Sequence, residues 1–143
     1  METARLLTLV ERQFTQRIAA ALDSVDGTVD QWRVLGLLAD GKGHPMTQVA
    51  EHVILAAPTV TKIVDRLISR GLVYRRVDDT DRRRVLIFIS ARGRTTLRRW
   101  SAAVAGERAR LEAAAGDDLA QLGEVLGRIV ARLDTPLPAG PHP

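Results

Sequence analysis

Hydrophobic residues recur every three or four positions along most of the chain, a spacing that places side chains on one face of an α-helix. The first such stretch predicts a helix over residues 3–23. Its apolar face is formed by Leu7, Val10, Phe14, Ile18 and Ala21. Near the other end, Asp117 is expected to cap a final helix with apolar positions at spacings of 3, 4, 3 and 4, namely Leu119, Leu122, Leu126, Ile129 and Leu133. Such a heptad-like stripe is typical of helix–helix packing, including packing between chains.

Between these ends, the pattern predicts shorter helices. Thr28 or Asp30 can cap the second helix, because both side chains accept hydrogen bonds from free backbone N–H groups. Residues 41–45 hold Gly and Pro and predict a turn. Thr47 is then expected to cap a short helix over residues 48–53.

The next helix has the clearest two-sided pattern. Pro58 suits its first turn, where the missing N–H of proline costs nothing, and Gly71 follows its end. Its apolar stripe consists of Val60, Ile63, Val64, Leu67 and Ile68. Groups that donate or accept hydrogen bonds occupy the opposite arc: Thr59, Thr61, Lys62, Asp65, Arg66 and Ser69.

After Gly71 the period changes to that of β-strands. Residues 72–77 and 85–89 predict two strands, and the loop between them carries three acids and then an arginine triplet, Arg82–Arg84. A two-stranded hairpin is marginal alone, so it must pack against the helices. A long helix over residues 92–115 follows.

This order of elements predicts a mainly α-helical fold with a small β-hairpin wing. The winged helix-turn-helix core covers residues 30–90, and helices over 3–23 and 92–134 lie outside it as dimerisation helices. We expect one domain over residues 1–135 and a disordered, proline-rich tail over 136–143.

Charge is unevenly distributed along the 143 residues. The net charge is only +4, but residues 62–99 carry +8 and the rest of the chain −4. The genomic base composition can explain a preference for Arg over Lys, but it does not explain the clustering. A basic middle segment indicates a surface for a polyanion.

Double-stranded DNA fits this pattern, since the major groove admits one helix and the minor groove a narrow basic finger. The candidate DNA contacts are Thr47, Gln48, Pro58, Thr59, Thr61, Lys62, Arg66, Arg82, Arg83 and Arg84. The alternative for each is ordinary solvation: an exposed helix face, and an arginine triplet paired with neighbouring aspartates. Helix-turn-helix proteins usually dimerise, which predicts a homodimer on a pseudo-palindromic operator. An intramolecular helix bundle is the alternative to the dimer.

Residues 47–98 resemble the MarR family of winged-helix transcriptional regulators. The motifs that carry the resemblance are PTVTKIVDRL from Pro58, RGLV from Arg70 and DRRRVLIFIS from Asp81. The resemblance implies that Asp81 buttresses the wing and that Arg83 enters the minor groove. Two departures are Ala56–Ala57, where the family often has a capping Ser, and Asp79, where relatives commonly carry Pro.

The resemblance also implies a dimer interface built from the first and last two helices. Its expected contacts are Leu7, Val10, Leu119, Leu122, Leu126, Ile129 and Leu133. Relatives often bind small anionic aromatic molecules between the dimerisation and DNA-binding regions, and most act as repressors. Candidate effector-pocket residues are Phe14, Arg17, Trp32, Arg33 and Trp100, although Trp and Phe at helical spacing are more often core residues.

Other functions receive little support from the sequence. No phosphate-binding loop, nucleophile elbow or HExxH motif is present, so we expect no enzyme and no cofactor. The candidate zinc ligands are His44, Glu51 and His52, but we expect no metal site. Two alternative functions remain: a zinc-responsive regulator and a DNA-organising protein without an effector. With no Cys, a thiol sensor is excluded. The chain has five aromatic residues, which are few for stacking on RNA bases. It has no long apolar run and no signal-like N-terminus, so we expect a cytoplasmic, nucleoid-associated protein with no membrane partner.

Overall fold

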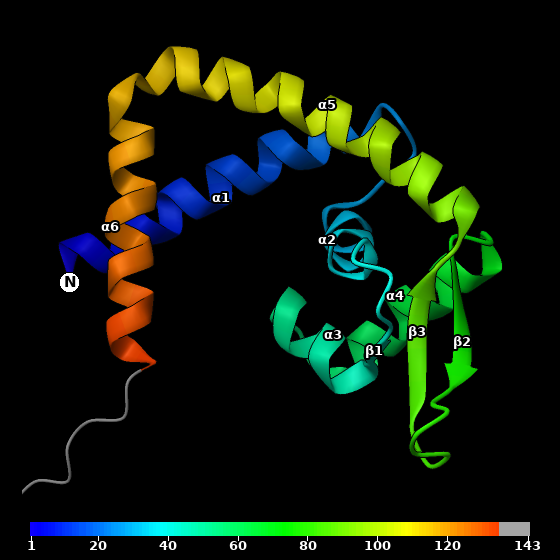
Figure 1. Cartoon of the computed structure of the whole chain (residues 1–143). Coiled ribbons are helices and arrows are strands. Elements are labelled where there is room, and N and C mark those ends of the chain that lie inside the picture. Colours follow the sequence, from blue (N-terminus) through cyan, green and yellow to red (C-terminus); the bar gives the residue numbers. More distant parts are fainter. Residues whose placement is uncertain (135–143) are drawn as a thin grey trace, which may run out of the picture. The chain divides into compact units, whose positions relative to one another are not determined.

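Six helices and three short strands make up residues 1–134, the part of the chain that the computed structural model describes (Figure 1). In chain order they are α1 Glu2–Asp23, α2 Val29–Leu38, β1 His44–Pro45, α3 Met46–Val53, α4 Ala57–Ser69, β2 Val73–Val77, β3 Val85–Ile89, α5 Ala91–Ala115 and α6 Asp117–Leu133. The predicted fold class, mainly α with a small β-hairpin wing, is confirmed. The tail predicted over residues 136–143 lies outside the described residues.

The strands form one antiparallel sheet in the order β1-β3-β2. Val73 pairs with Ile89 at the base of the hairpin, and Val77 pairs with Val85 at its outer end. The prediction of a plain turn over residues 41–45 is wrong at its end, because His44 and Pro45 pair with Ile87 and Leu86 of β3. We call β2, β3 and the loop between them, residues 73–89, the wing.

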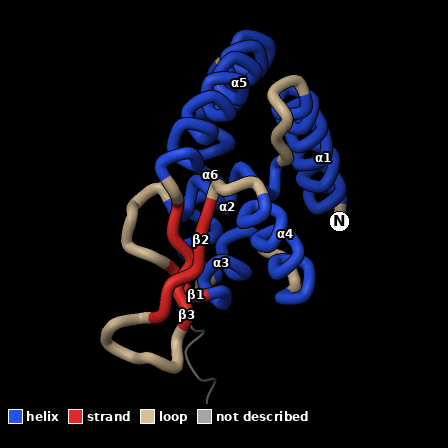
Figure 2. The backbone as a smooth tube through the Cα atoms, turned by 90° about the vertical axis from the view of Figure 1, so that its right-hand side faces the viewer, coloured by secondary structure: helices blue, strands red, loops and turns tan. Residues whose placement is uncertain are grey.

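The chain divides into two compact units, residues 1–107 and 108–143, and the boundary falls within α5. Each is described by itself, and the expected single domain over 1–135 stays a prediction. In the first unit, α2, α3 and α4 pack beside the sheet (Figure 2). Its core is formed by buried side chains from these helices, α1, the strands and α5, among them Leu22, Val34, Leu35, Leu38, Val49, Val60, Val64, Leu67, Ile87 and Trp100.

The described part of the second unit contains the end of α5 and all of α6. Gly116 separates the two helices with a φ of 58°, a conformation that glycine adopts without steric cost. No residue of α6 is buried within the chain, and Val125, Ile129, Val130 and Leu133 leave much of their apolar surface exposed.

Helix starts agree only partly with the sequence-based expectation. Thr28 caps α2, and its hydroxyl accepts a hydrogen bond from the Gln31 N–H at 3.1 Å. The prediction for Thr47 is wrong, since α3 already begins at Met46 after Pro45, and Asp117 lies inside the first turn of α6 rather than at its cap. The expected lack of a side-chain cap on α4 is confirmed, because Ala56 holds the cap position.

Candidate nucleic-acid interface

Helix α4 buries one face and exposes the other, as its sequence predicts. Val60, Val64 and Leu67 are fully buried, so the opposite arc faces outward. Two hydroxyl groups on this arc bond to their own helix: Thr61 Oγ1 donates to the Ala57 carbonyl at 3.0 Å, and Ser69 donates to the carbonyl of Arg66.

Three exposed side chains of α4 keep their polar groups available. Within residues 1–134, no hydrogen bond or ion pair joins the side chains of Thr59, Lys62 or Arg66 to another side chain. One hydroxyl, one ammonium and one guanidinium group are therefore free to meet a ligand. The two charged groups lie four residues apart and share one side of the helix.

The acid on the same arc is neutralised by the wing. Arg75 of β2 donates from Nη2 to Asp65 Oδ1 at 2.6 Å, which ties α4 to the wing across ten residues of sequence. Both side chains are about half exposed, and a pair of this kind contributes at most about 1 kcal/mol. Its main effect is positional, since it holds the wing strand beside the exposed face of α4. The helical pattern of Asp65 alone does not reveal this partner.

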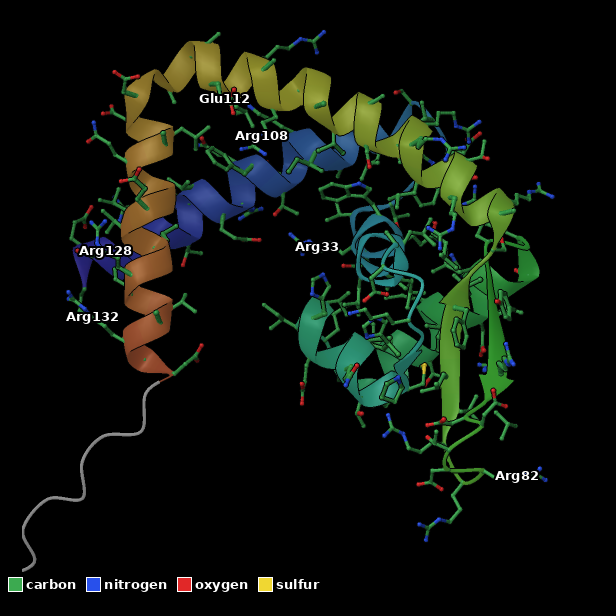
Figure 3. All side chains as sticks on the ribbon, viewed as in Figure 1. Arg33, Arg82, Arg108, Glu112, Arg128 and Arg132 are labelled. Carbon is green, nitrogen blue, oxygen red and sulfur yellow. The ribbon has the colours of Figure 1, made fainter. Side chains whose placement is uncertain are left out.

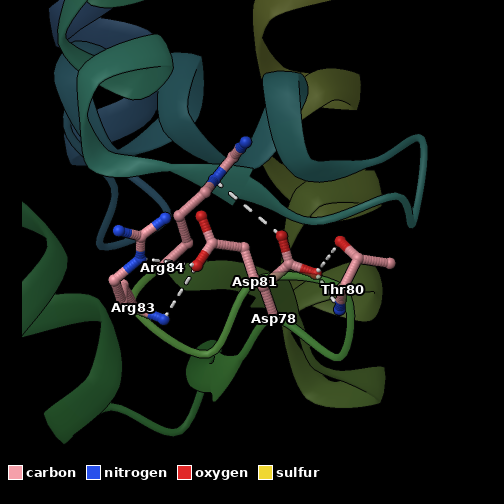
Figure 4. A network of polar contacts seen from close by, with 5 residues as sticks. All are labelled: Asp78, Thr80, Asp81, Arg83 and Arg84. Atoms are coloured by element: carbon pink, nitrogen blue, oxygen red, sulfur yellow. Dashed lines mark hydrogen bonds and ion pairs between the residues drawn. The ribbon is translucent and has the colours of Figure 1, made fainter.

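Asp78 closes the turn of the wing (Figure 4). Its Oδ1 atom accepts hydrogen bonds from the backbone N–H of Thr80 at 3.0 Å and from the Thr80 hydroxyl at 2.8 Å. These bonds, with a smaller contribution from Arg84, hold the pKa of the Asp78 carboxyl below its ordinary value. Asp78 therefore remains ionised at neutral pH and keeps the turn closed. The sequence places Asp78 in a turn-rich segment beside the arginines, but it does not reveal that Thr80 is its main partner.

Asp81 organises the arginine triplet. Its Oδ1 atom accepts hydrogen bonds from the backbone N–H of Arg83 at 3.1 Å and from Arg83 Nε at 3.2 Å. The Arg83 side chain is nevertheless 91% exposed, so its remaining donors point into solvent. Arg82 extends from the tip of the wing (Figure 3), while Arg84 lies 3.8 Å from Asp78.

The base of the wing is fixed to the start of α5 by Ser90. Its hydroxyl donates to the Gly71 carbonyl at 2.6 Å and accepts from the Gly93 N–H at 2.9 Å. Gly93 is required at this point, because a Cβ atom there would lie 2.0 Å from the Leu72 carbonyl oxygen. Neither residue was singled out from the sequence as structural, since the contact joins segments about 20 residues apart.

The first turn of α3 carries the other two candidate contacts. Thr47 and Gln48 are both exposed. Gln48 is not free, because its Oε1 atom lies 2.9 Å from the Nδ1 atom of His44.

The five candidate effector residues do not form a common polar cluster. Within residues 1–134, no hydrogen bond, ion pair or ring contact joins any two of them. Trp100 is fully buried: its Nε1 donates to the Val25 carbonyl, and the Arg70 guanidinium lies 5.4 Å from its ring centroid. It serves as a core residue here and offers a ligand no exposed atom.

The other four candidates stay predictions. Trp32 is half-buried and donates from Nε1 to Ser101 Oγ at 3.3 Å. Arg17 forms an ion pair with Glu107 at 3.5 Å. Phe14 and Arg33 are half-buried.

The candidate dimer residues retain apolar surface. Leu7 of α1 is 40% exposed and Val10 is half-buried. On α6, exposure increases along the predicted stripe from the half-buried Leu119, Leu122 and Leu126 to Ile129 at 43% and Leu133 at 78%.

Metal and membrane sites receive no support from the described residues. No group of three or more His, Cys, Asp or Glu side chains is arranged to hold a metal ion within residues 1–134. In the same part of the chain, no helix combines the length and the apolar character needed to cross a bilayer.

Comparison with known proteins gives this geometry a context. The family model described as "MarR family" matches residues 25–84, which cover α2 through the wing turn. The organic hydroperoxide resistance transcriptional regulator of Bacillus subtilis is 27% identical over 128 residues, covering 90% of this chain and 86% of that protein. Over residues 25–84 the chain is therefore similar to the MarR family.

Two further comparisons also find transcriptional repressors. The HTH-type transcriptional repressor IacR of Pseudomonas putida is 34% identical over 67 residues, which are 47% of this chain. The matched part spans only 40% of that repressor's length. Among solved structures, the transcriptional repressor CouR bound to a 23-mer DNA duplex superimposes with a TM-score of 0.80 at 28% identity, covering 87% of this chain and 89% of that one.

Proposed function

We propose that this protein is a dimeric transcriptional regulator of the MarR family that binds double-stranded DNA in a sequence-specific manner. One observation carries the proposal: the free polar face of α4 lies next to a wing whose tip carries three consecutive arginines. In this arrangement, α4 enters the major groove and the wing reaches the adjacent minor groove. Structural similarity to a repressor bound to a DNA duplex supports the same reading.

The free side chains of α4 suit base recognition. Lysine and arginine donate to the O6 and N7 acceptors of guanine, and a threonine contacts either a base edge or a thymine methyl group. Lys62, Arg66 and Thr59 supply these groups, and no side chain of residues 1–134 competes for them. Because Arg75 neutralises Asp65, no free carboxylate on this face repels phosphate.

The wing suits the minor groove. The electrostatic potential is most negative where that groove is narrow, which attracts inserted arginine side chains. Asp81 holds the backbone and Nε of Arg83, so less conformational freedom is lost when Arg83 binds. Minor-groove and phosphate contacts carry little base identity, so the wing supplies affinity more than specificity.

Dimerisation follows from the apolar surface left on α1 and α6. Leu7 on α1 and Ile129 and Leu133 on α6 remain exposed within one chain, and a second copy provides apolar partners for such surface. Two recognition helices then read half-sites about one DNA turn apart, which implies a pseudo-palindromic operator.

Repression and its release by a small molecule are the finer parts of the proposal. The name of the Pseudomonas putida relative identifies that protein as a repressor. In this proposal Arg17 or Arg33 would bind the anionic group of an aromatic effector, and Phe14 and Trp32 would contact its ring. A regulator of this kind acts in the prokaryotic cytoplasm, where it binds the DNA of the nucleoid.

Two variants test whether α4 determines the preferred DNA sequence and the wing determines the overall affinity. The preferred duplex is first selected from a random-sequence pool by the unmodified protein. Lys62→Ala is expected to recover a different preferred sequence, because it removes a base contact, whereas Arg83→Ala weakens binding to all sequences by about tenfold. Arg12→Ala, which removes the same charge from an exposed position of α1, serves as the control.

Two results would contradict this assignment. If Arg83→Ala and Arg12→Ala bind with equal affinity, the wing does not contact DNA. If Lys62→Ala selects the same sequence as the unmodified protein, then α4 does not read bases through that residue. Selection of no preferred sequence at all would favour a DNA-organising protein instead.

A further inference from the structure

Ile54, the first residue after α3, has an unusual backbone conformation. Its φ of 58° and ψ of 48° lie in the left-handed helical region. A side chain branched at Cβ crowds the neighbouring backbone in this region, which is normally occupied by glycine and, less often, by Asn or Asp. Among residues 1–134, Asp26 is the one other non-glycine residue with a positive φ. The turn between α3 and α4 therefore contains a strain that glycine would not have.

The side chain of Ile54 is not packed into the protein core. It is 87% exposed, whereas Val53 before it is buried and Leu55 after it packs against the core. Within residues 1–134, no large hydrophobic side chain other than Met1 is more exposed. A single exposed hydrophobic residue is ordinary, but here the exposure coincides with a strained backbone. Burial within the chain therefore does not explain why isoleucine occupies this position.

The hydrogen bonds of this turn do not explain the isoleucine either. The Ile54 N–H donates to the Ala50 carbonyl and ends α3, and the Leu55 N–H donates to the same carbonyl at 3.3 Å. Both bonds use backbone atoms alone. Glycine makes such bonds at the end of a helix without steric strain. The fold requires the left-handed turn, but it does not require a large apolar side chain there.

Ile54 is followed directly by the exposed start of α4. Ala56, Ala57 and Pro58 are all exposed, and none of their side chains carries a polar group. Together with Ile54 they form an apolar surface at the end of α4 that, in the proposed function, leads into the major groove. The small side chains allow a close approach of DNA. Ile54 adds the one large apolar group of this surface.

We propose that Ile54 is a specificity-determining residue that contacts the methyl group of a thymine in each half-site. This inference rests on the proposed function, in which the start of α4 faces base edges. In the major groove, thymine is distinguished by its C5-methyl group, which apolar side chains contact. The contact removes apolar surface of Ile54 from water, so it favours the complex. It gives a function to a side chain whose conformation lowers the stability of the free protein.

Ile54→Gly is expected to change stability and DNA binding in opposite directions. The melting temperature of the full chain should rise by about 2–4 °C, because glycine adopts the left-handed conformation without strain. Affinity for the selected duplex should fall by about five- to tenfold, because the apolar contact is lost. A residue with a purely structural role does not give this pair of results. Asp26→Gly is the matched control, since it relieves the same backbone conformation after α1 and should not weaken DNA binding.

The thymine itself is identified by replacing each thymine of the selected half-site with uracil, which lacks only the methyl group. At one position, uracil should weaken binding of the unmodified protein by about fourfold, the effect of one buried methyl group. Ile54→Gly should bind the thymine and uracil duplexes equally at that position. If uracil has the same effect on both proteins at every position, Ile54 does not read thymine and the proposal is overturned.

Three other results would also contradict the inference, and each has a different meaning. If Ile54→Gly binds the selected duplex as tightly as the unmodified protein, its side chain does not contact DNA, and the proposed function is unaffected. A weaker dimer of Ile54→Gly in sedimentation would assign the side chain to a contact between copies of the chain. If the unmodified protein selects no preferred duplex, the proposed function itself fails.

Discussion

Gly93 is the residue on which the attachment of the wing depends most directly. Its N–H donates to Ser90, and the Leu72 carbonyl oxygen occupies the space that a side chain would need. Asp65 and Arg75 make a second connection, between α4 and β2. These contacts fix the wing relative to α4, so a few single residues determine the spacing of the two elements that we propose to contact DNA.

Gly93→Ala is expected to lower the free energy of unfolding by at least about 2 kcal/mol, because the added methyl group collides with backbone that cannot move independently. Urea denaturation monitored by circular dichroism measures the change. Gly106→Ala on the same helix is the matched control: nothing lies within 4 Å of its Cβ position, so it should raise stability by about 0.5–1 kcal/mol. Equal stabilities of the two variants would show that Gly93 does not set this contact.

The structural role of a residue could be predicted from the sequence where that role depends only on the residue's own backbone conformation. Pro58 in the first turn of α4 and the positive φ of Gly71 follow from their own backbone chemistry. The partner of Asp65 and the packing of Gly93 could not be predicted, since they depend on residues brought together only by the folded chain. Trp100 was ambiguous because helical spacing describes a core side chain and a pocket side chain equally well.

At the scale of elements, α4 begins without a side-chain cap. Ala56 holds the cap position, and Pro58 has no N–H to satisfy. The Thr59 and Val60 N–H groups both donate to the Ala56 carbonyl, at 3.0 and 3.1 Å, so backbone bonds close the first turn. The partial positive charge of this helix end still favours a nearby phosphate. The departure from a capping residue therefore costs some helix stability.

Ala56→Ser is expected to raise the free energy of unfolding by about 0.5–1 kcal/mol, because the hydroxyl offers the Thr59 N–H a second acceptor beside the backbone carbonyl of residue 56, to which it donates at 3.0 Å. Thermal and urea unfolding give the measurement. Ala102→Ser, at an exposed position inside α5, provides the comparison and should cost a few tenths of a kcal/mol. If Ala56→Ser is no more stable than the unmodified protein, the start of α4 is not limited by its cap.

Elements with a strong local pattern were the easiest to predict. The strand over residues 85–89 was found at its observed bounds, because five consecutive β-prone residues admit few other structures. Strand β1 was missed, since it has only two residues and one of them is proline. Its pairing comes from β3, which gives His44 a place that local sequence does not indicate.

In the molecule as a whole, α6 is the helix whose apolar face lacks burial within one chain. A 17-residue helix without a buried residue is not explained by the packing of one chain. Helices of this length are held in place chiefly by burial of an apolar face. In the proposed dimer a second copy of the chain supplies that burial, as the heptad-like stripe from Leu119 to Leu133 predicts.

Ile129→Asp is expected to weaken the dimer by at least about tenfold, because it places a charge in the apolar stripe of the interface. Ile129 is 43% exposed within the chain, so its replacement opens no cavity in the monomer core. Sedimentation at several concentrations reports the dissociation. Arg128→Asp, one position away but outside the stripe, should leave the dimer unchanged. A dimer equally strong in both variants would exclude α6 from the interface.

The central claim is that the free face of α4 and the arginine-tipped wing recognise a particular DNA sequence. A competition assay at about 0.15 M salt tests it most directly, with the selected duplex labelled and either the same duplex or a random-sequence duplex as competitor. We predict that the random duplex competes at least about 10³-fold less well. If both competitors displace the labelled duplex equally, the protein binds DNA only through charge, and the account of α4 as a reader of sequence is wrong.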